Sequence, residues 1–444
     1  MRPQAYSVYI VRFTFALTEM NKEDNGIRRF QLILGAIFAA ASVLYLLTLY
    51  LTGIEGEVIN SYFPYADELM HGIIPETEHS PFALLFIFLP RLFFSTPFEY
   101  NIAFVAEVFV FLLIGLVAMG KLAKRYYQNQ RMIMLAYSVL MLLMFQFVAD
   151  RYDIFPTILT MLSFYFFVTK KYVWAFALLS IASMTNLYPA VLFPIYLFPF
   201  LINRDWSNTL KGAGTFVVIA FLIVLPFIVV NQDSALHFIS NYIERPLQVE
   251  SSIASLIAFG SALGLTGTWV EFSHGTDNLM GSWPDAVVPY MIPLMLLAMI
   301  VIYVVHAYLL VELRKDGRDS ENNRMILLGG AALLSFSALF IFGKAFPSQY
   351  LILIIPFIIF MMMTSISHTA KRRTFVLSMI VIALTQLNFA VNIGISGGGA
   401  GITDAGMMII LARNIVMVIL FAYVIKISVE NARKGPWSVQ TTDE

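Results

Sequence analysis

Three charged residues within four positions interrupt an apolar part of the chain. They are Asp150, Arg151 and Asp153, in the stretch QFVADRYDIFPTIL (residues 146–159). An arginine in a tight turn is suited to bidentate contact with a phosphate or a carboxylate. An ordinary turn at a membrane surface, with an Arg–Asp pair reaching water, explains the same residues. Both interpretations stay open, although polar groups so near a hydrocarbon core are often functional.

Two further stretches combine cations with other polar side chains. In RPLQVESSIASL, Arg245 precedes Gln248, Glu250 and two serines that can cap a helix. A helix start beside an arginine can bind an anion, and plain capping is the alternative. In GKAFPSQYLILIIP, Lys344 and Gln349 lie at the end of an apolar span, where a lysine often extends to the membrane surface without another role.

Two acids, Glu55 and Glu57, come directly after the first apolar span, in the segment expected to face outward. For any one acid in such a segment, a solvated loop residue is the usual explanation.

The composition is that of a membrane protein. Of the 444 residues, 59% are hydrophobic and 13% are charged, and the mean hydropathy is +0.78. Soluble domains are nearer to half apolar and a quarter charged. There is no cysteine, which excludes disulfides, thiolate metal sites and thiol nucleophiles.

Runs of apolar residues predict an all-α polytopic membrane protein of about twelve transmembrane helices. The predicted spans are 30–52, 101–120, 132–149, 154–169, 172–185, 187–202, 212–231, 286–311, 325–343, 350–365, 374–394 and 405–427. Residues 1–29 are expected to form a cytoplasmic or interfacial segment, residues 30–427 the transmembrane domain, and residues 428–444 a cytoplasmic tail. The longest outer loops are expected at 53–100 and 232–285.

The distribution of basic residues predicts the orientation. With both termini in the cytoplasm, the inner segments carry 23 of the 28 Lys and Arg residues. The outer segments carry only Arg91, Arg151, Arg245 and Lys344, and Arg413 falls within the last span. We therefore expect the polar residues that could take part in catalysis or binding to lie together on the extracytoplasmic face.

Four stretches in this order resemble GT-C type glycosyltransferases, most closely the polyprenol-phosphate-mannose-dependent glycosyltransferase family 87. They are YFPYADELMHGIIPETEHSPFA, RYDIFPTILTML, RPLQVESSIASL and GKAFPSQYLILIIP. The sequence departs from the family pattern in the first outer loop, where Glu55 and Glu57 stand in place of an aspartate. It also has His79-Ser80-Pro81 in place of Tyr-Pro-Pro, and Asn186 in place of a lysine.

The resemblance implies a GT-C type bundle with interfacial helices in the first outer loop, and an inverting transfer from a polyprenyl- or dolichyl-phosphate sugar. The sugar would pass to a glycan or glycolipid acceptor on the extracytoplasmic face, with mannose as the family-level expectation. Glu57 is then the favoured base, followed by Glu55 and Asp67. The donor phosphate would be bound by Arg151, Arg245 and Lys344. Substrate binding is expected from Tyr62, Tyr65, His79, Asp153, Asn186, Tyr188, Gln248, Glu250, Gln349 and Tyr350.

The expected partners are the lipid-linked sugar, the acceptor and membrane lipid, with no nucleic acid. No cofactor is expected, and no histidine or acid spacing indicates a divalent metal site. A transporter or lipid flippase without transferase activity is the main alternative, because twelve spans is also a common transporter count. Transporters place their polar residues near the bilayer midplane, however, and here they gather at one face. A non-catalytic scaffold for glycan assembly is a third interpretation.

Overall fold

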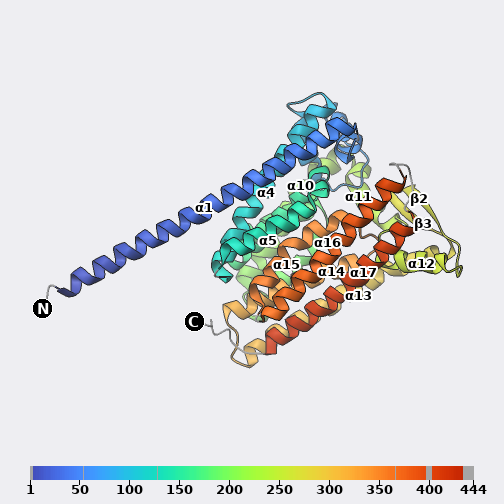
Figure 1. The fold of residues 1–444 in the computed structure, drawn as a ribbon. Helices are drawn as coiled ribbons and strands as arrows, with labels where there is room; N and C mark the ends of the chain where they lie inside the picture. Colours follow the sequence, from blue (N-terminus) through green and yellow to red (C-terminus); the bar gives the residue numbers. More distant parts are fainter. Residues whose placement is uncertain (1–3, 54, 128, 366, 397–402, 434–444) are drawn as a thin grey trace.

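The computed structural model describes residues 4–53, 55–127, 129–365, 367–396 and 403–433. These residues form a bundle of α-helices with one small sheet at one end (Figure 1), as an all-α polytopic membrane protein requires. Among the described residues, seven helices are long and apolar enough to cross a membrane. They are α1 (Gln4–Thr52), α4 (Pro97–Tyr126), α10 (Trp206–Val230), α13 (Ser282–Lys315), α14 (Glu321–Phe342), α16 (His368–Ser396) and α17 (Asp404–Arg433).

The other five predicted spans are helices of 11 to 15 residues, shorter than the ~20 residues of a full span. They are α5 (Gln130–Leu143) with its continuation α6 (Phe145–Asp150), α7 (Ile154–Val168), α8 (Tyr172–Thr185), α9 (Leu192–Ile202) and α15 (Leu351–Thr364). Short 3₁₀ turns precede α9 at Tyr188–Val191 and α15 at Ser348–Tyr350. The polar turns DRYD, TNLYP and FPSQY thus shorten these helices at one end.

Helix α1 joins the predicted N-terminal segment and the first predicted span into one continuous helix. No break in the helix therefore marks the expected boundary at residue 29. In Figure 1 the first part of α1 extends away from the other helices.

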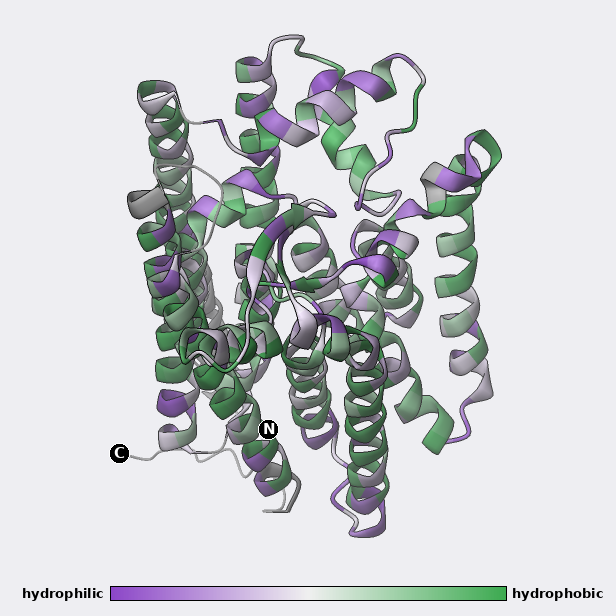
Figure 2. Ribbon diagram, turned by 90° about the vertical axis from the view of Figure 1, so that its right-hand side faces the viewer, coloured by the Kyte–Doolittle hydropathy of each residue, from purple (hydrophilic) through white to green (hydrophobic). Residues whose placement is uncertain are grey.

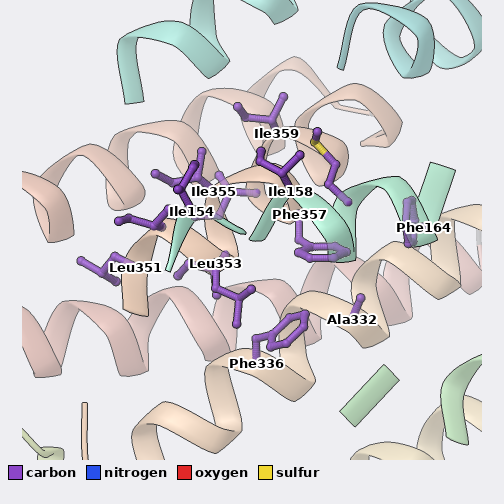
Figure 3. Packing of buried hydrophobic residues seen from close by; sticks show 14 of the residues in the cluster. Ile154, Ile158, Phe164, Ala332, Phe336, Leu351, Leu353, Ile355, Phe357 and Ile359 are labelled. Carbon is purple, nitrogen blue, oxygen red and sulfur yellow. The ribbon is translucent and has the colours of Figure 1, made fainter. Parts of the chain in front are cut away.

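The core of the bundle is centred on α15, all of whose residues are buried. A helix that is apolar on every side is stable only when other elements surround it. Figure 3 shows α7 and α14 packing against it: the rings of Phe164 and Phe336 lie 5.5 and 5.2 Å from the ring of Phe357. This packing fixes the start of α15, and with it the turn that precedes the helix.

Both long loops are folded at the same end of the bundle as the sheet. The first carries the π-helical turn η1 (Val58–Tyr62), α2 (Phe63–Met70) and α3 (Ala83–Arg91), so helices occur where the first outer loop was expected to carry them. The second carries α11 (Gln232–Glu244), β1 (Leu247–Gln248), α12 (Ser252–Ala262), β2 (Trp269–Ser273) and β3 (Thr276–Met280). The strands form an antiparallel sheet in the order β1-β3-β2, which the sequence analysis did not anticipate.

Charged residues sort to the two ends of the bundle. At one end, Glu321 pairs with Arg125 and with Lys170, and all three belong to segments predicted to be cytoplasmic. At the other end, Arg151 pairs with Glu57, and both were predicted to lie outside. Figure 2 shows hydrophilic residues gathered at the ends and hydrophobic residues along the helices between them. The predicted inner and outer groups therefore occupy opposite ends of the molecule.

Candidate functional site

A polar cavity of about 270 Å³ opens at the end of the bundle that carries the sheet. This volume is near the lower end of the ~300–1,000 Å³ typical of small-molecule sites. Its wall comes mainly from the loop before α3, the α6–α7 turn, the turns before α9 and α15, and the C-terminal part of α11 with the β2–β3 turn. Single residues from η1, β1, α13 and α14 complete it. The residues that line it are Tyr62, Glu78, His79, Ser80, Arg151, Tyr152, Asp153, Asn186, Leu187, Tyr188, Phe238, Asn241, Tyr242, Arg245, Gln248, Gly275, Thr276, Met295, Leu339, Pro347, Gln349 and Tyr350.

The DRYD turn ties the first outer loop to the cavity. The Nη1 of Arg151 lies 3.1 Å from Oε2 of Glu57, and Arg151 also lines the cavity. Oδ2 of Asp150 accepts a hydrogen bond of 3.1 Å from the backbone N–H of Glu57. A Cβ atom on Gly56 would lie 2.0 Å from Oδ1 of Asp150, so only glycine permits this close approach. The turn thereby fixes the position of the Glu57 carboxylate beside the arginine.

Asp153 lies in the cavity wall with an unusual protonation behaviour. Its side chain is buried, and this burial raises the pKa of Asp153 to about 6, although the Arg151 charge opposes the shift. A carboxyl group with this pKa titrates near physiological pH. Near pH 6, Asp153 therefore holds a proton part of the time, whereas an ordinary aspartate is almost fully ionised.

Arg245 is the second cation of the cavity. It is only 9% exposed, and its Nη2 donates a 2.8 Å hydrogen bond to the carbonyl of His274. Its buried Nε has no hydrogen-bond partner among the described residues. A buried donor on a permanent cation, facing a cavity, is suited to an anionic ligand.

Lys344 supports Arg245 from behind the cavity wall. Its buried Nζ donates hydrogen bonds to the carbonyls of Ile243, at 2.7 Å, and Arg245, at 3.1 Å. Burial, followed by repulsion from Arg245, lowers the pKa of Lys344 below its ordinary value. Lys344 was expected to bind the donor phosphate, but it does not line the cavity. Its hydrogen bonds instead hold the C-terminal end of α11 and the residue that follows it.

A polar network behind the wall positions the FPSQY turn. The carboxylate of Glu250 accepts hydrogen bonds from the backbone N–H and the hydroxyl of Ser348, each at 2.7 Å. Arg413, fully buried, donates to the carbonyls of Glu250 and Phe346 at 2.7 and 3.1 Å. Because Ser348 is held in this way, the following residue, Gln349, lines the cavity.

Hydroxyl and amide groups cover much of the remaining wall. The hydroxyls of Tyr188 and Tyr350 are hydrogen-bonded to each other, and the amide of Asn186 donates to the hydroxyl of Tyr152 at 3.2 Å. The hydroxyl of Tyr62 accepts from the backbone N–H of Tyr152 at 3.4 Å. This surface offers several polar groups at fixed positions, as recognition of a polyhydroxylated ligand requires.

Glu78 and His79 reach the cavity from the first outer loop. The Nε2 of His79 lies 3.9 Å from Oε1 of Glu78, which is too long for a hydrogen bond. Burial lowers the pKa of His79, so its imidazole is neutral at pH 7. Burial alone would raise the pKa of Glu78, but His79 when it is protonated, the Glu78 backbone N–H and the two cavity arginines lower it.

The structure brings most of the predicted site residues together at the cavity. Those that line it are Tyr62, His79, Arg151, Asp153, Asn186, Tyr188, Arg245, Gln248, Gln349 and Tyr350. Those that do not line it are Glu55, Glu57, Tyr65, Asp67, Glu250 and Lys344.

The predicted residues outside the cavity differ in how far they lie from it. Glu57 touches the cavity residue Arg151, and the ring of Tyr65 lies 6.0 Å from that of His79. Glu55 is exposed, and Asp67 pairs with Arg91 at 2.8 Å. Among the described residues, no ion pair joins Glu55 or Asp67 to a residue that was assigned to substrate or phosphate.

Several cavity residues were not predicted as site residues. Glu78 was counted only as one of many outer acids, although it directly precedes a predicted site residue. Asn241 and Tyr242 belong to α11, and Gly275 and Thr276 to the β2–β3 turn. The turn could not be expected because strands of five residues carry little sequence periodicity.

The described residues contain no group of three or more His, Asp or Glu side chains that could hold a metal ion. A helical membrane protein with arginines, carboxylates and hydroxyl groups around a cavity at one end of its bundle has the features of a membrane-embedded transferase. The model of glycosyltransferase family 87 matches residues 77–340, more than half of the chain. The chain therefore belongs to glycosyltransferase family 87. No curated protein matches it significantly.

Proposed function

We propose that this glycosyltransferase moves a sugar from a polyprenyl- or dolichyl-phosphate donor to a glycan or glycolipid acceptor. The observation that carries the proposal is the convergence of Arg151 and Arg245 on one cavity at the end of a membrane bundle. A lipid-linked donor has its phosphate at headgroup depth, because its isoprenoid tail stays in the bilayer. Two arginines at that depth supply charge-assisted hydrogen bonds for a single phosphate.

Two arginines at the phosphate would remove the need for an acid catalyst. Polyprenyl phosphate leaves with the electron pair of the broken C1–O bond, and Arg151 and Arg245 stabilise its negative charge. The arginines would neutralise the phosphate charge that a divalent metal neutralises in other enzymes. We therefore propose transfer without a metal ion or another cofactor.

The acceptor hydroxyl needs a base, and we propose Glu57 for this role. Its carboxylate would take the hydroxyl proton while the acceptor oxygen forms the new bond to C1 from the face opposite the phosphate. This single displacement inverts the anomeric centre, as in the inverting half of carboxylate-assisted glycoside chemistry. The contact with Arg151, at 3.1 Å, holds the Glu57 carboxylate beside the cavity.

The other polar residues of the cavity would bind the sugar. Asn186, Tyr188, Gln349 and Tyr350 present amide and hydroxyl groups within one wall, and Asp153 adds a carboxylate. Such groups fix the orientation of hydroxyl-rich ligands by directed hydrogen bonds. We propose mannose as the transferred sugar and the extracytoplasmic face as the location of the site, with both termini in the cytoplasm.

The experiment is incubation of the purified protein with labelled polyprenyl-phosphate mannose and a membrane lipid extract. We expect label to appear in a new glycosylated product, and the Glu57→Gln variant to form none. Labelled product with an unchanged rate in the variant would exclude Glu57 as the base. Absence of transfer by the folded wild-type protein, or solute uptake into vesicles instead, would overturn the proposed function.

A further inference from the structure

We propose that Glu78 and His79 bind neighbouring hydroxyl groups of a sugar ring in the cavity, and so determine which sugar is accepted. This inference rests on the proposed function and adds a specificity site to it. The hydroxyls can belong to the donor sugar or to the acceptor, because both carry the same chemistry.

His79 is the residue that points most directly to a ligand. Its side chain is only 6% exposed, it lines the cavity, and neither Nδ1 nor Nε2 has a hydrogen-bond partner among the described residues. Buried polar atoms normally have partners, and two on one ring require an explanation. A neutral imidazole offers one donor and one acceptor, which matches a hydroxyl group.

The surroundings of His79 leave few alternative partners. The rings of Tyr62, Tyr65 and Tyr152 approach it edge to face, with centroids 5.4, 6.0 and 4.7 Å away. These rings fix the imidazole and cover its sides. The cavity and the nearby carboxylate of Glu78 are the two sources of a partner that the structure places beside the ring.

Glu78 supplies a carboxylate beside the imidazole. The 3.9 Å separation between Oε1 and the Nε2 of His79 leaves both atoms able to bind a third group. Glu78 is partly buried, with 27% of its side chain exposed, and it also lines the cavity. A carboxylate accepts hydrogen bonds from adjacent ring hydroxyls, while the imidazole binds one of them.

The β2–β3 turn closes over this pair. Gly275 has φ of +72°, and a Cβ atom there would lie 2.9 Å from Oε1 of Glu78. Glycine is therefore required both by the backbone conformation and by the approach to the carboxylate. The next residue, Thr276, lines the cavity as well, so the turn encloses the proposed sugar site on one side.

The test uses the variants Glu78→Gln and His79→Phe in the full-length protein. Glu76→Gln is the matched control, because Glu76 lies two residues away in the same loop and is exposed. Two quantities are measured: the affinity for polyprenyl-phosphate mannose alone, and the KM for the lipid-extract acceptor during transfer. We expect each variant to weaken one of them ~10- to 100-fold, since hydrogen bonds to charged groups are the strong ones.

The two sources of hydroxyls give different results. Weaker donor binding in the absence of acceptor assigns the pair to the donor sugar. Unchanged donor binding with a raised acceptor KM assigns it to the acceptor. If both variants match Glu76→Gln in both measurements, the inference is overturned while the proposed function stands. If the wild-type protein transfers no sugar, the proposed function fails, and this inference fails with it.

A second measurement covers the case in which His79→Phe does not fold. Deoxy analogues of polyprenyl-phosphate mannose, each lacking one ring hydroxyl, and acceptors modified in the same way are compared in the wild type and in Glu78→Gln. For the recognised hydroxyl, the loss caused by the analogue and the loss caused by Glu78→Gln should not add. Additive losses for every hydroxyl would overturn the inference.

Discussion

The guanidinium of Arg151 lies 3.1 Å from Oε2 of Glu57, and Arg151 also lines the cavity. These residues are far apart in sequence, and the hydrogen bond from Glu57 N–H to Asp150 holds their segments together. One arginine therefore contacts the proposed base and faces the space proposed for the donor phosphate. The two functions assigned to this end of the bundle are coupled through a single side chain.

Removal of the Glu57 carboxylate should stop the chemical step. We expect Glu57→Gln to lower kcat by ~100- to 10,000-fold, the usual contribution of a general base, with a smaller effect on donor KM. Steady-state kinetics with a labelled donor measure both. Glu55→Gln is the control, since Glu55 is exposed and lies two residues away. A Glu57→Gln enzyme with wild-type kcat would show that another group removes the proton.

Variants of Arg245 and of Lys344 should differ in their effects on donor KM and on Tm. We expect Arg245→Lys to raise donor KM with little change in Tm, because the lysine keeps the charge but loses the forked geometry. Lys344→Met should raise donor KM and also lower Tm, because it leaves the carbonyls of Ile243 and Arg245 without their donor. Each unsatisfied buried group costs ~1–3 kcal/mol.

The control for Lys344→Met is Lys426→Met, since Lys426 is 62% exposed on α17. Its Tm should match that of the wild type. If Lys344→Met raised donor KM and left Tm unchanged, Lys344 would be acting on the phosphate directly.

The helices were predictable because hydropathy alone marks them. Each of the twelve apolar runs corresponds to a helix, including the weakest, at α7 and α8. The short runs 154–169 and 172–185 match α7 and α8 to within one residue, because the polar turns that bound them are visible in the sequence. The break between α5 and α6 was not predicted, because no glycine, proline or charged residue marks it. The β2–β3 hairpin was missed because nothing in five residues of WVEFS or TDNLM distinguishes a strand from a loop.

The candidate cations could be found because few Lys or Arg residues interrupt the apolar runs on the predicted outer side. Arg151 and Arg245 both line the cavity. The acids were harder, because their partners lie far away in the sequence. Asp67 pairs with Arg91, and Glu250 binds Ser348, and no local pattern encodes either choice. Glu78 could have been found only by knowing that its loop folds over the cavity.

Asp153 should make stability depend on pH. Burial raises its pKa to about 6, above the value in the unfolded chain, so above pH 6 the folded state bears the cost of a buried charge. As pH falls from about 6 towards the ordinary aspartate pKa near 4, the folded state takes up a proton before the unfolded chain does, and the cost shrinks progressively. We therefore expect Asp153→Asn to raise Tm at pH 7.5 and to keep only about half of this advantage at pH 5.

Thermal unfolding of both proteins in detergent between pH 5 and pH 8 measures this difference. The variant should also transfer sugar more slowly, because Asp153 lines the cavity. A Tm difference that is constant across the pH range would mean that the carboxyl group does not titrate as its burial implies.

Arg413 should be indispensable although it does not reach the cavity. It is fully buried, it donates to the carbonyls of Glu250 and Phe346, and its guanidinium lies 4.4 Å from the Phe346 ring centroid. A lysine at this position keeps the charge but cannot make the forked contacts or stack on the ring. Breaking such a buried arrangement costs ~3–5 kcal/mol, so we expect Arg413→Lys to lower Tm strongly.

Loss of transfer should accompany this loss of stability, because Arg413 connects the segments that carry Gln248 and Gln349 to α17. Arg372→Lys is the control, since Arg372 is exposed on α16. Transfer is measured at a temperature at which Arg413→Lys remains folded, so that lost activity reports the position of the two segments and not unfolding. Wild-type kinetics under those conditions would show that the network behind the wall stabilises the bundle without shaping the cavity.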